Sequence, residues 1–152
     1  GETTLLPALG DDAGGVHCVY RTAVSNTPKL LPVKIYEMSE LIKYVDTAEG
    51  RYSLDDPWCS NLYVLTNKSR INGAAGIMYE GVLKKLADKL ESDMYILPSS
   101  IHEVIILPKS TMFNKEELMA MVRDVNTEGV SKDEVLSYTV YEYDRNTEEI
   151  YS

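Results

Sequence analysis

Apolar residues recur at helical spacing in two early stretches of the chain. One runs from Met38 to Val45, where Ser39 is placed to cap the helix, and the other covers residues 81–93, where leucines and lysines occupy opposite faces. A helix with one apolar face has to bury that face against another element. We therefore expect both helices to pack on a sheet.

Two capping boxes predict helix starts in the second half of the chain. Asn114 precedes Glu117 by three positions, and Ser131 precedes Glu134 by the same interval. In such a pair each side chain bonds to the backbone amide of the other residue. The first box predicts a helix of about three turns that Gly129 ends, and the second predicts a short further helix.

Strands are expected where β-branched and aromatic residues gather. The runs are 16–21, 61–67, 74–79, 94–97, 101–107 and 138–143. Turn-forming residues join the second run to the third and the fourth to the fifth, which predicts two hairpins. The stretch 25–32 contains Pro28 and Pro32 and is expected to be a turn-rich connector.

The order of these elements indicates an α+β fold. Hairpins followed by helices favour a mainly antiparallel sheet with helices packed on it, as a single-domain sandwich. The length of 152 residues suits one domain, which we place at 16–152 and expect to be a fragment of a longer protein. Residues 1–15, rich in glycine, are expected to form a mobile leader or a tag-proximal segment.

The run 101–107 is apolar on both of its faces. Val104 and Ile106 alternate with Ile105 and Leu107, so both rows need cover. This pattern is typical of a central strand that is buried on both sides. We expect the turn formed by residues 98–100 to lie at a rim of the sheet.

The candidate chemistry lies at the start of that run, in Ser99, Ser100, His102 and Glu103. A serine nucleophile with His102 as its base suits acyl transfer, although Ser100 and His102 on one strand face lie roughly 6–7 Å apart at their Cα atoms. The cluster also suits binding of a small ligand without chemistry. The structural alternative, which we favour, is that the serines close a turn while His102 and Glu103 satisfy loop backbone groups.

Other motifs give weaker signals. No GxSxG elbow is present, and the HEVII stretch lacks the second histidine of a HExxH zinc site. The INGAAG run is neither a Walker loop nor GxGxxG, and close packing explains Gly73 and Gly76 better than phosphate binding does. Cys18 and Cys59 lack CxxC spacing and are expected to be buried free thiols. We therefore expect no metal and no cofactor.

The charge balance disfavours two kinds of binding partner. With 24 Asp and Glu against 15 Lys and Arg, the net charge of −9 disfavours nucleic acid and anionic membrane surfaces. No apolar run approaches the roughly 18–20 residues that cross a bilayer, and no signal peptide is evident. We expect a cytoplasmic protein. A protein partner or a homo-oligomer is compatible with this charge.

One long stretch resembles a known family. The stretch YVLTNKSRINGAAGIMYEGVLKKLADKLESDMYILPSSIHEVIILP, with SNTPKLLP before it and MVRDVN and VLSYTVYEYDR after it, is similar to a bacterial family, domain of unknown function 5688, found mostly in gut Firmicutes. The similarity runs from about Ala23 to about Arg145. It implies an intracellular protein whose relatives carry a further N-terminal region, and it implies no activity, cofactor or catalytic residue.

Two function classes follow from these observations. The first is a non-catalytic interaction or regulatory module, and the second is a small hydrolase-like enzyme that uses Ser100, His102 and Glu103. A deep pocket where these side chains converge would favour the enzyme. A shallow surface with an apolar patch would favour the module.

Overall fold

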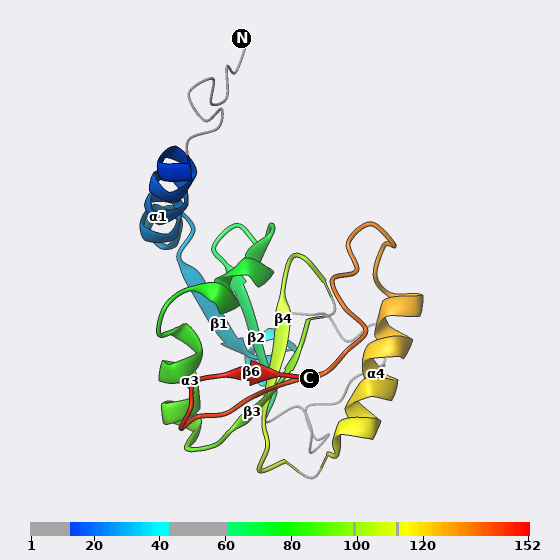
Figure 1. Cartoon of the computed structure of the whole chain (residues 1–152). Coiled ribbons are helices and arrows are strands. Elements are labelled where there is room, and N and C mark those ends of the chain that lie inside the picture. Colours follow the sequence, from blue (N-terminus) through cyan, green and yellow to red (C-terminus); the bar gives the residue numbers. More distant parts are fainter. Residues whose placement is uncertain (1–12, 43–60, 99, 112) are drawn as a thin grey trace.

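Within residues 13–42, 61–98, 100–111 and 113–152, which the computed structural model describes, six strands form one antiparallel sheet in the order β1-β2-β4-β3-β5-β6 (Figure 1). The strands are β1 (Val33–Glu37), β2 (Tyr63–Asn67), β3 (Met94–Leu97), β4 (Val104–Pro108), β5 (Tyr141–Tyr143) and β6 (Ile150–Tyr151). The helices are α1 (Ala13–Leu30), α2 (Met38–Ile42), the 3-10 helix η4 (Gly73–Met78), α3 (Val82–Leu90) and α4 (Lys115–Glu128). The predicted α+β fold is confirmed.

The connections place helices on both faces of the sheet. Strands β2 and β3 are parallel, with β4 between them, and α3 lies in their connection; β4 and β5 are likewise parallel, with β3 between them, and are joined through α4. Both connections cross the sheet in the same direction, but β2 and β3 run in the opposite sense to β4 and β5. Two crossovers of the same hand must then put α3 and α4 on opposite faces, as Figure 1 shows.

Each face carries its own hydrophobic core. The α3 core joins α3 and Ala74 of η4 to the sheet and consists of Tyr63, Leu65, Ala74, Leu83, Leu86, Ala87, Met94, Ile96, Val104, Ile106 and Tyr143. The α4 core lies on the other face and consists of Leu62, Leu97, Leu107, Leu118, Val122 and Val140. Strand β4 contributes alternate residues to both cores, so the prediction of an interior strand is confirmed, although the strand begins at Val104 rather than Ile101.

The predicted partner strand at 74–79 is wrong. This stretch forms η4, and β2 pairs instead with β1, which the sequence pattern missed, and with β4. A Cβ atom on Gly76 would lie 2.5 Å from the Val33 side chain, so the small residues let η4 pack closely on the sheet. The expected close packing at this glycine is therefore present, but in a helix rather than a strand.

The predictions for residues 16–32 are also wrong, whereas residues 1–12 of the expected leader lie outside the described residues. Residues 16–21 and most of 25–32 belong to the single helix α1, which has Pro28 in its last turn. Because proline has no amide hydrogen, the last turn loses one backbone hydrogen bond, and the helix still continues to Leu30. The Leu31 amide then bonds to the Thr27 carbonyl at 2.8 Å. Cys18 lies on α1 and is exposed rather than buried, and Cys59 lies outside the described residues.

The two capping boxes have different outcomes. At the first, the Glu117 amide donates to Asn114 Oδ1 at 2.9 Å and the Asn114 amide donates to Glu117 Oε2 at 3.0 Å, which confirms the start of α4. The second forms only a turn, in which the Glu134 amide bonds to the Ser131 carbonyl at 2.8 Å. Val135, the next residue, forms a β-bridge with Ser100, and this pairing is incompatible with a helix at that position.

Helix α2 and the last strands also differ from the sequence pattern. Ser39 lies inside α2, which begins at Met38, and Val45 lies outside the described residues. The last predicted strand is confirmed only over β5, and β6 was not predicted. Of the helices in the described parts of the chain, none has the length and apolar character to cross a membrane.

Candidate functional site

Three loops meet at one end of the sheet and bring the candidate residues together. They are the loop after β2, the loop between β3 and β4, and the turn after α4. The Ile101 amide bonds to the Glu134 carbonyl at 2.9 Å, and the Ala74 amide bonds to the Ile101 carbonyl at 3.2 Å. We call this meeting point the loop junction and define it by Thr66, Asn72, Gly73, Ser100, His102 and Glu134.

His102 is the centre of the loop junction. Its Nδ1 atom accepts a hydrogen bond from the Asn72 amide at 3.1 Å, and its Nε2 atom lies 3.3 Å from Glu134 Oε1. Because a backbone amide can only donate, Nδ1 must carry the lone pair, which assigns the proton to Nε2 facing the carboxylate. Both ring nitrogens therefore hold neighbouring loops.

The serine next to it is engaged by the backbone. Ser100 is buried, and its Oγ accepts a hydrogen bond from the His102 amide at 2.9 Å. The side chain of Glu103 is exposed, and Ser99 lies outside the described residues. The structure thus joins Ser100 and His102, adds Glu134 and leaves Glu103 on the surface.

Gly73 lets the loop junction close. Thr66 Oγ1 donates to the His102 carbonyl at 2.8 Å, directly beside the Gly73 backbone. A Cβ atom at Gly73 would lie 2.2 Å from Thr66 Oγ1 and 2.6 Å from the His102 oxygen, so only glycine fits. The loops that contain Gly73 and His102 therefore pack against each other, and Asn72 takes a left-handed conformation with φ 53° to deliver its amide.

The residues that complete the loop junction were not found from the sequence. Asn72 lies 30 positions from His102, and Glu134 was interpreted only as part of a capping box. No local pattern links such residues, because the contacts arise when β4 is inserted between β2 and β3. Across the described ranges, no group of three or more His, Cys, Asp or Glu side chains is arranged to hold a metal ion.

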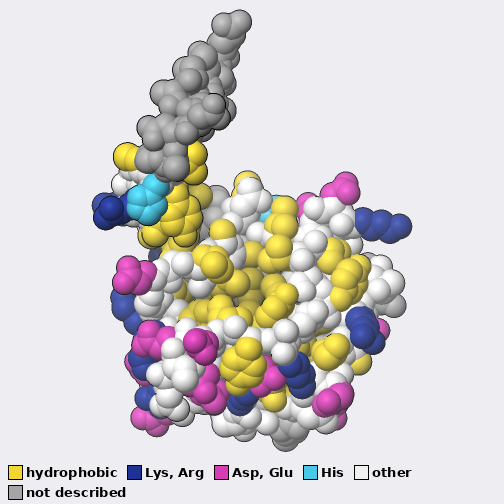
Figure 2. All heavy atoms as spheres, viewed as in Figure 1, with side chains coloured by type: hydrophobic (Ala, Val, Ile, Leu, Met, Phe, Trp, Pro, Cys, Tyr) yellow, Lys and Arg dark blue, Asp and Glu magenta, His cyan; other side chains and the backbone are white. Residues whose placement is uncertain are grey.

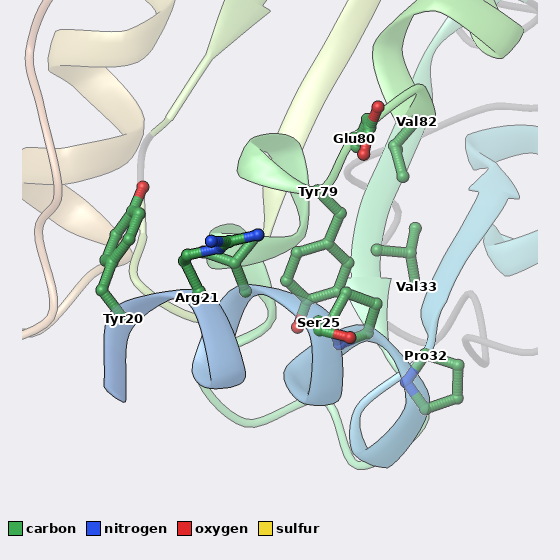
Figure 3. A pocket seen from close by; sticks show the side chains of 10 residues that line it. Tyr20, Arg21, Ser25, Pro32, Val33, Tyr79, Glu80 and Val82 are labelled. Carbon is green, nitrogen blue, oxygen red and sulfur yellow. The ribbon is translucent and has the colours of Figure 1, made fainter. Parts of the chain in front are cut away.

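An apolar groove lies apart from the loop junction, between α1 and the sheet. It has a volume of about 620 Å³ and is lined by Tyr20, Arg21, Val24, Ser25, Pro28, Pro32, Val33, Tyr79, Glu80 and Val82. Figure 3 shows Tyr79 reaching from the segment before α3 to α1, with Val33 and Val82 facing each other beside it. We call this hollow the α1 groove.

A second hollow of about 470 Å³ adjoins it between β1 and α3. It shares Val33 and Val82 with the α1 groove and adds Ile35, Glu37, Glu40, Tyr63, Lys85, Leu86 and Lys89. Burial, with a smaller contribution from the Glu37 charge, raises the pKa of Tyr63 above its usual range, and the Lys89 ammonium lies 5.9 Å from the centre of its ring. The two hollows share these two valines, and their lining residues carry charges of both signs.

Helix α1 exposes most of its apolar side chains. Val16, Val19, Tyr20 and Val24 are 41–66% exposed, and no described side chain of α1 is buried. In Figure 2 hydrophobic side chains run down α1 to the body, where a wider hydrophobic area covers the face in view. Tyr20, Val24 and Pro28 of α1 also line the α1 groove, so the helix and the groove share apolar side chains.

Comparison with known proteins identifies a family but no function. Residues 15–145 match a family of unknown function, DUF5688, so the match begins earlier than the expected Ala23 and includes nearly all of α1. No significant match is found among curated proteins or solved structures. Because the matched region covers most of the chain, this protein belongs to the DUF5688 family of unknown function.

Proposed function

We propose that the chain is a non-catalytic interaction module whose binding surface is α1 together with the α1 groove. One observation carries the proposal: an 18-residue helix exposes its apolar side chains next to an open apolar groove. Contiguous exposed apolar surface of this kind is typical of protein-binding sites. The proposal keeps the interaction module favoured by the sequence and assigns its surface.

The composition of α1 supports the same conclusion. The helix contains Gly14, Gly15 and Pro28 besides five β-branched residues, all of which are weaker helix formers than alanine or leucine. Isolated helices of this length are marginal in water, and most helices in proteins gain their stability from packing. The α1 helix gains little from its own domain, so contact with a partner would supply the missing stabilisation.

The loop junction supports a structural role for the sequence cluster. Both nitrogens of His102 and the Ser100 oxygen engage groups of the protein itself. A serine nucleophile needs a base that can take its proton, and the imidazole has no free nitrogen for that purpose. This arrangement fits a clamp between loops better than an acyl-transfer site.

A photo-crosslinking experiment tests the interaction surface. Tyr20→p-benzoylphenylalanine places a photo-reactive ring of similar shape on α1, where the tyrosine is 66% exposed, and Tyr138→p-benzoylphenylalanine is the matched control at 51% exposure. Irradiation of the native host cells is expected to give a discrete protein adduct from position 20 alone. Failure to form such an adduct, or the same adduct from both positions, would contradict the proposal.

The alternative is a small hydrolase-like enzyme that uses Ser100, His102 and Glu103, and the 3.3 Å contact of His102 with Glu134 is the observation that favours it. His102→Ala separates the two functions. Removal of a structural imidazole breaks the exposed hydrogen bond from the Asn72 amide, which costs about 0.5–1.5 kcal/mol in the free energy of unfolding. A catalytic imidazole would be lost with little change in stability but with loss of turnover of an ester substrate.

We also place the chain in the cytoplasm. The exposed free thiol of Cys18 supports this assignment, because oxidising compartments favour paired or absent cysteines. Labelling of this thiol by a permeant maleimide in intact host cells, but not by an impermeant one, is the expected result.

A further inference from the structure

We infer that the partner of this surface is a second copy of the chain, with α1 of each copy lying in the α1 groove of the other across a two-fold axis. The inference rests on the proposed function and names its partner. An isologous interface needs one patch that is complementary to itself. Helix α1 supplies the projecting part of such a patch, and the α1 groove supplies the receiving part.

The apolar side chains of α1 have the spacing that this packing needs. Val16, Tyr20, Val24 and Pro28 are each four positions apart and form one ridge along the helix. Tyr20, Val24 and Pro28 of this ridge also line the α1 groove, and the groove and the adjoining hollow add apolar lining that includes Val33 and Val82. Helix α1 of a second copy that enters the groove therefore contacts both the ridge and the valines of the first copy.

The charge distribution favours a second copy at this place. Two chains of net charge −9 repel each other over most of their surfaces, so they can meet only where the charge is balanced or positive. Helix α1 carries Arg21 and Lys29 and no acidic residue. The two hollows carry three carboxylates (Glu37, Glu40 and Glu80) and three cations (Arg21, Lys85 and Lys89), so the charge of their lining is balanced and α1 of a second copy can approach it without net repulsion.

The available area suits a reversible dimer. The exposed parts of six apolar side chains (Val16, Val19, Tyr20, Val24, Leu30 and Leu31) amount to on the order of 500 Å² per copy, against about 800 Å² in an interface of standard size. The polar rim adds to this area. We therefore expect a dimer that dissociates in the micromolar range.

Sedimentation equilibrium of the purified chain from about 1 to 300 μM tests the inference. The wild type is expected to shift from monomer to dimer across this range. Val24→Asp on the ridge is expected to raise the dissociation constant at least tenfold, whereas Leu136→Asp, at an apolar position of similar exposure on a loop that lines neither hollow, leaves it within twofold. A dimer that persists unchanged in Val24→Asp would overturn the inference.

A second variant guards against unwinding of α1 by the aspartate. Ile35→Lys alters the receiving surface, at a strand position that is 38% exposed, and leaves α1 intact. It is expected to raise the dissociation constant at least tenfold as well. If only Val24→Asp weakens the dimer, the receiving surface is not the one inferred here.

The crosslinking experiment separates failure of the inference from failure of the proposed function. An adduct from position 20 with twice the mass of the chain supports a second copy. A strictly monomeric chain with an adduct of another mass overturns the second copy and leaves the interaction module standing. A monomeric chain with no adduct overturns both.

Discussion

At the scale of single residues, Glu142 on β5 pairs with two lysines. It contacts the Lys109 ammonium and lies 2.9 Å from the Lys115 ammonium, and its side chain is only 16% exposed. Hydrogen bonds from these two lysines hold the pKa of Glu142 below its usual value. Burial alone would lower the pKa of Lys109, but its bonds to Glu142 and to the Tyr151 hydroxyl raise it to about 12. The network therefore ties the turn after β4 to α4, β5 and β6.

The Glu142 network predicts a dependence of stability on pH. Since the folded pKa lies below the usual value of 4.5, the stabilisation is present above 4.5 and is lost as the pH falls through the folded value. Glu142→Gln is expected to cost on the order of 1–2 kcal/mol at pH 7 and progressively less below pH 4.5. Urea unfolding from pH 7 to pH 2 measures the difference, and Glu103→Gln controls for the change in net charge. A difference that stays constant over this range would contradict the network.

Gly73 allows a sharper test of packing in the loop junction. Gly73→Ala places a methyl group 2.2 Å from Thr66 Oγ1 and 2.6 Å from the His102 carbonyl, so the loops must separate, at a cost of about 2–4 kcal/mol in the free energy of unfolding. Gly81→Ala is the matched control, because it has no neighbour within 4 Å and only its φ of +72° is unfavourable, worth about 1–2 kcal/mol. Equal losses in the two variants, measured by urea unfolding, would show that the loop junction is loose.

The same scale shows what the sequence could predict of the candidate site. Ser100 and His102 were found because they interrupt an apolar run, which is a local pattern. Their partners Asn72 and Glu134 lie in other loops and carry no local mark. The role of Ser100 also depends on the fold. A bend at residues 101–102 replaces the expected start of the strand and lets the Ser100 oxygen accept a hydrogen bond from the His102 amide.

At the scale of elements, the sequence predicts a helix or strand correctly where that element is stabilised by its own residues. Helix α3 has a complete apolar face, and α4 has both halves of its capping box. The short strands β1 and β6 and the 3-10 helix η4 are formed by pairing and packing with other segments. Helix α1 is the extreme case, because its β-branched residues favour a strand when they are read locally.

The two capping boxes provide a prediction at this scale. Asn114→Ala removes a bonded cap and is expected to lower the free energy of unfolding by about 1 kcal/mol. Ser131→Ala changes an exposed residue whose backbone carbonyl alone takes part in the turn, so the expected loss is less than about 0.5 kcal/mol. Chemical denaturation of both variants measures the two losses in the free energy of unfolding. A larger loss at Ser131 than at Asn114 would contradict the assigned helix start.

At the scale of the whole molecule, the two hydrophobic cores depend on one sheet. Strands β3 and β4 place residues alternately in the α3 core and the α4 core, as with Ile96 and Leu97, or Ile106 and Leu107. A strand cannot lose one of its faces and keep the hydrogen-bonded register of the other. The two helices should therefore unfold together although they never share a core.

Paired core truncations test this cooperativity. Leu86→Ala in α3 and Leu118→Ala in α4 each remove a side chain that is at most 4% exposed, at an expected cost of about 2–4 kcal/mol. Because the two leucines lie on opposite faces, their effects should add within about 0.5 kcal/mol in the double variant. Unfolding followed by circular dichroism and by tyrosine fluorescence should give one coincident transition in each single variant. If Leu118→Ala released α4 in a separate early transition while the α3 core remained folded, the sheet would not couple its two faces, and the molecule would consist of two independently stable layers.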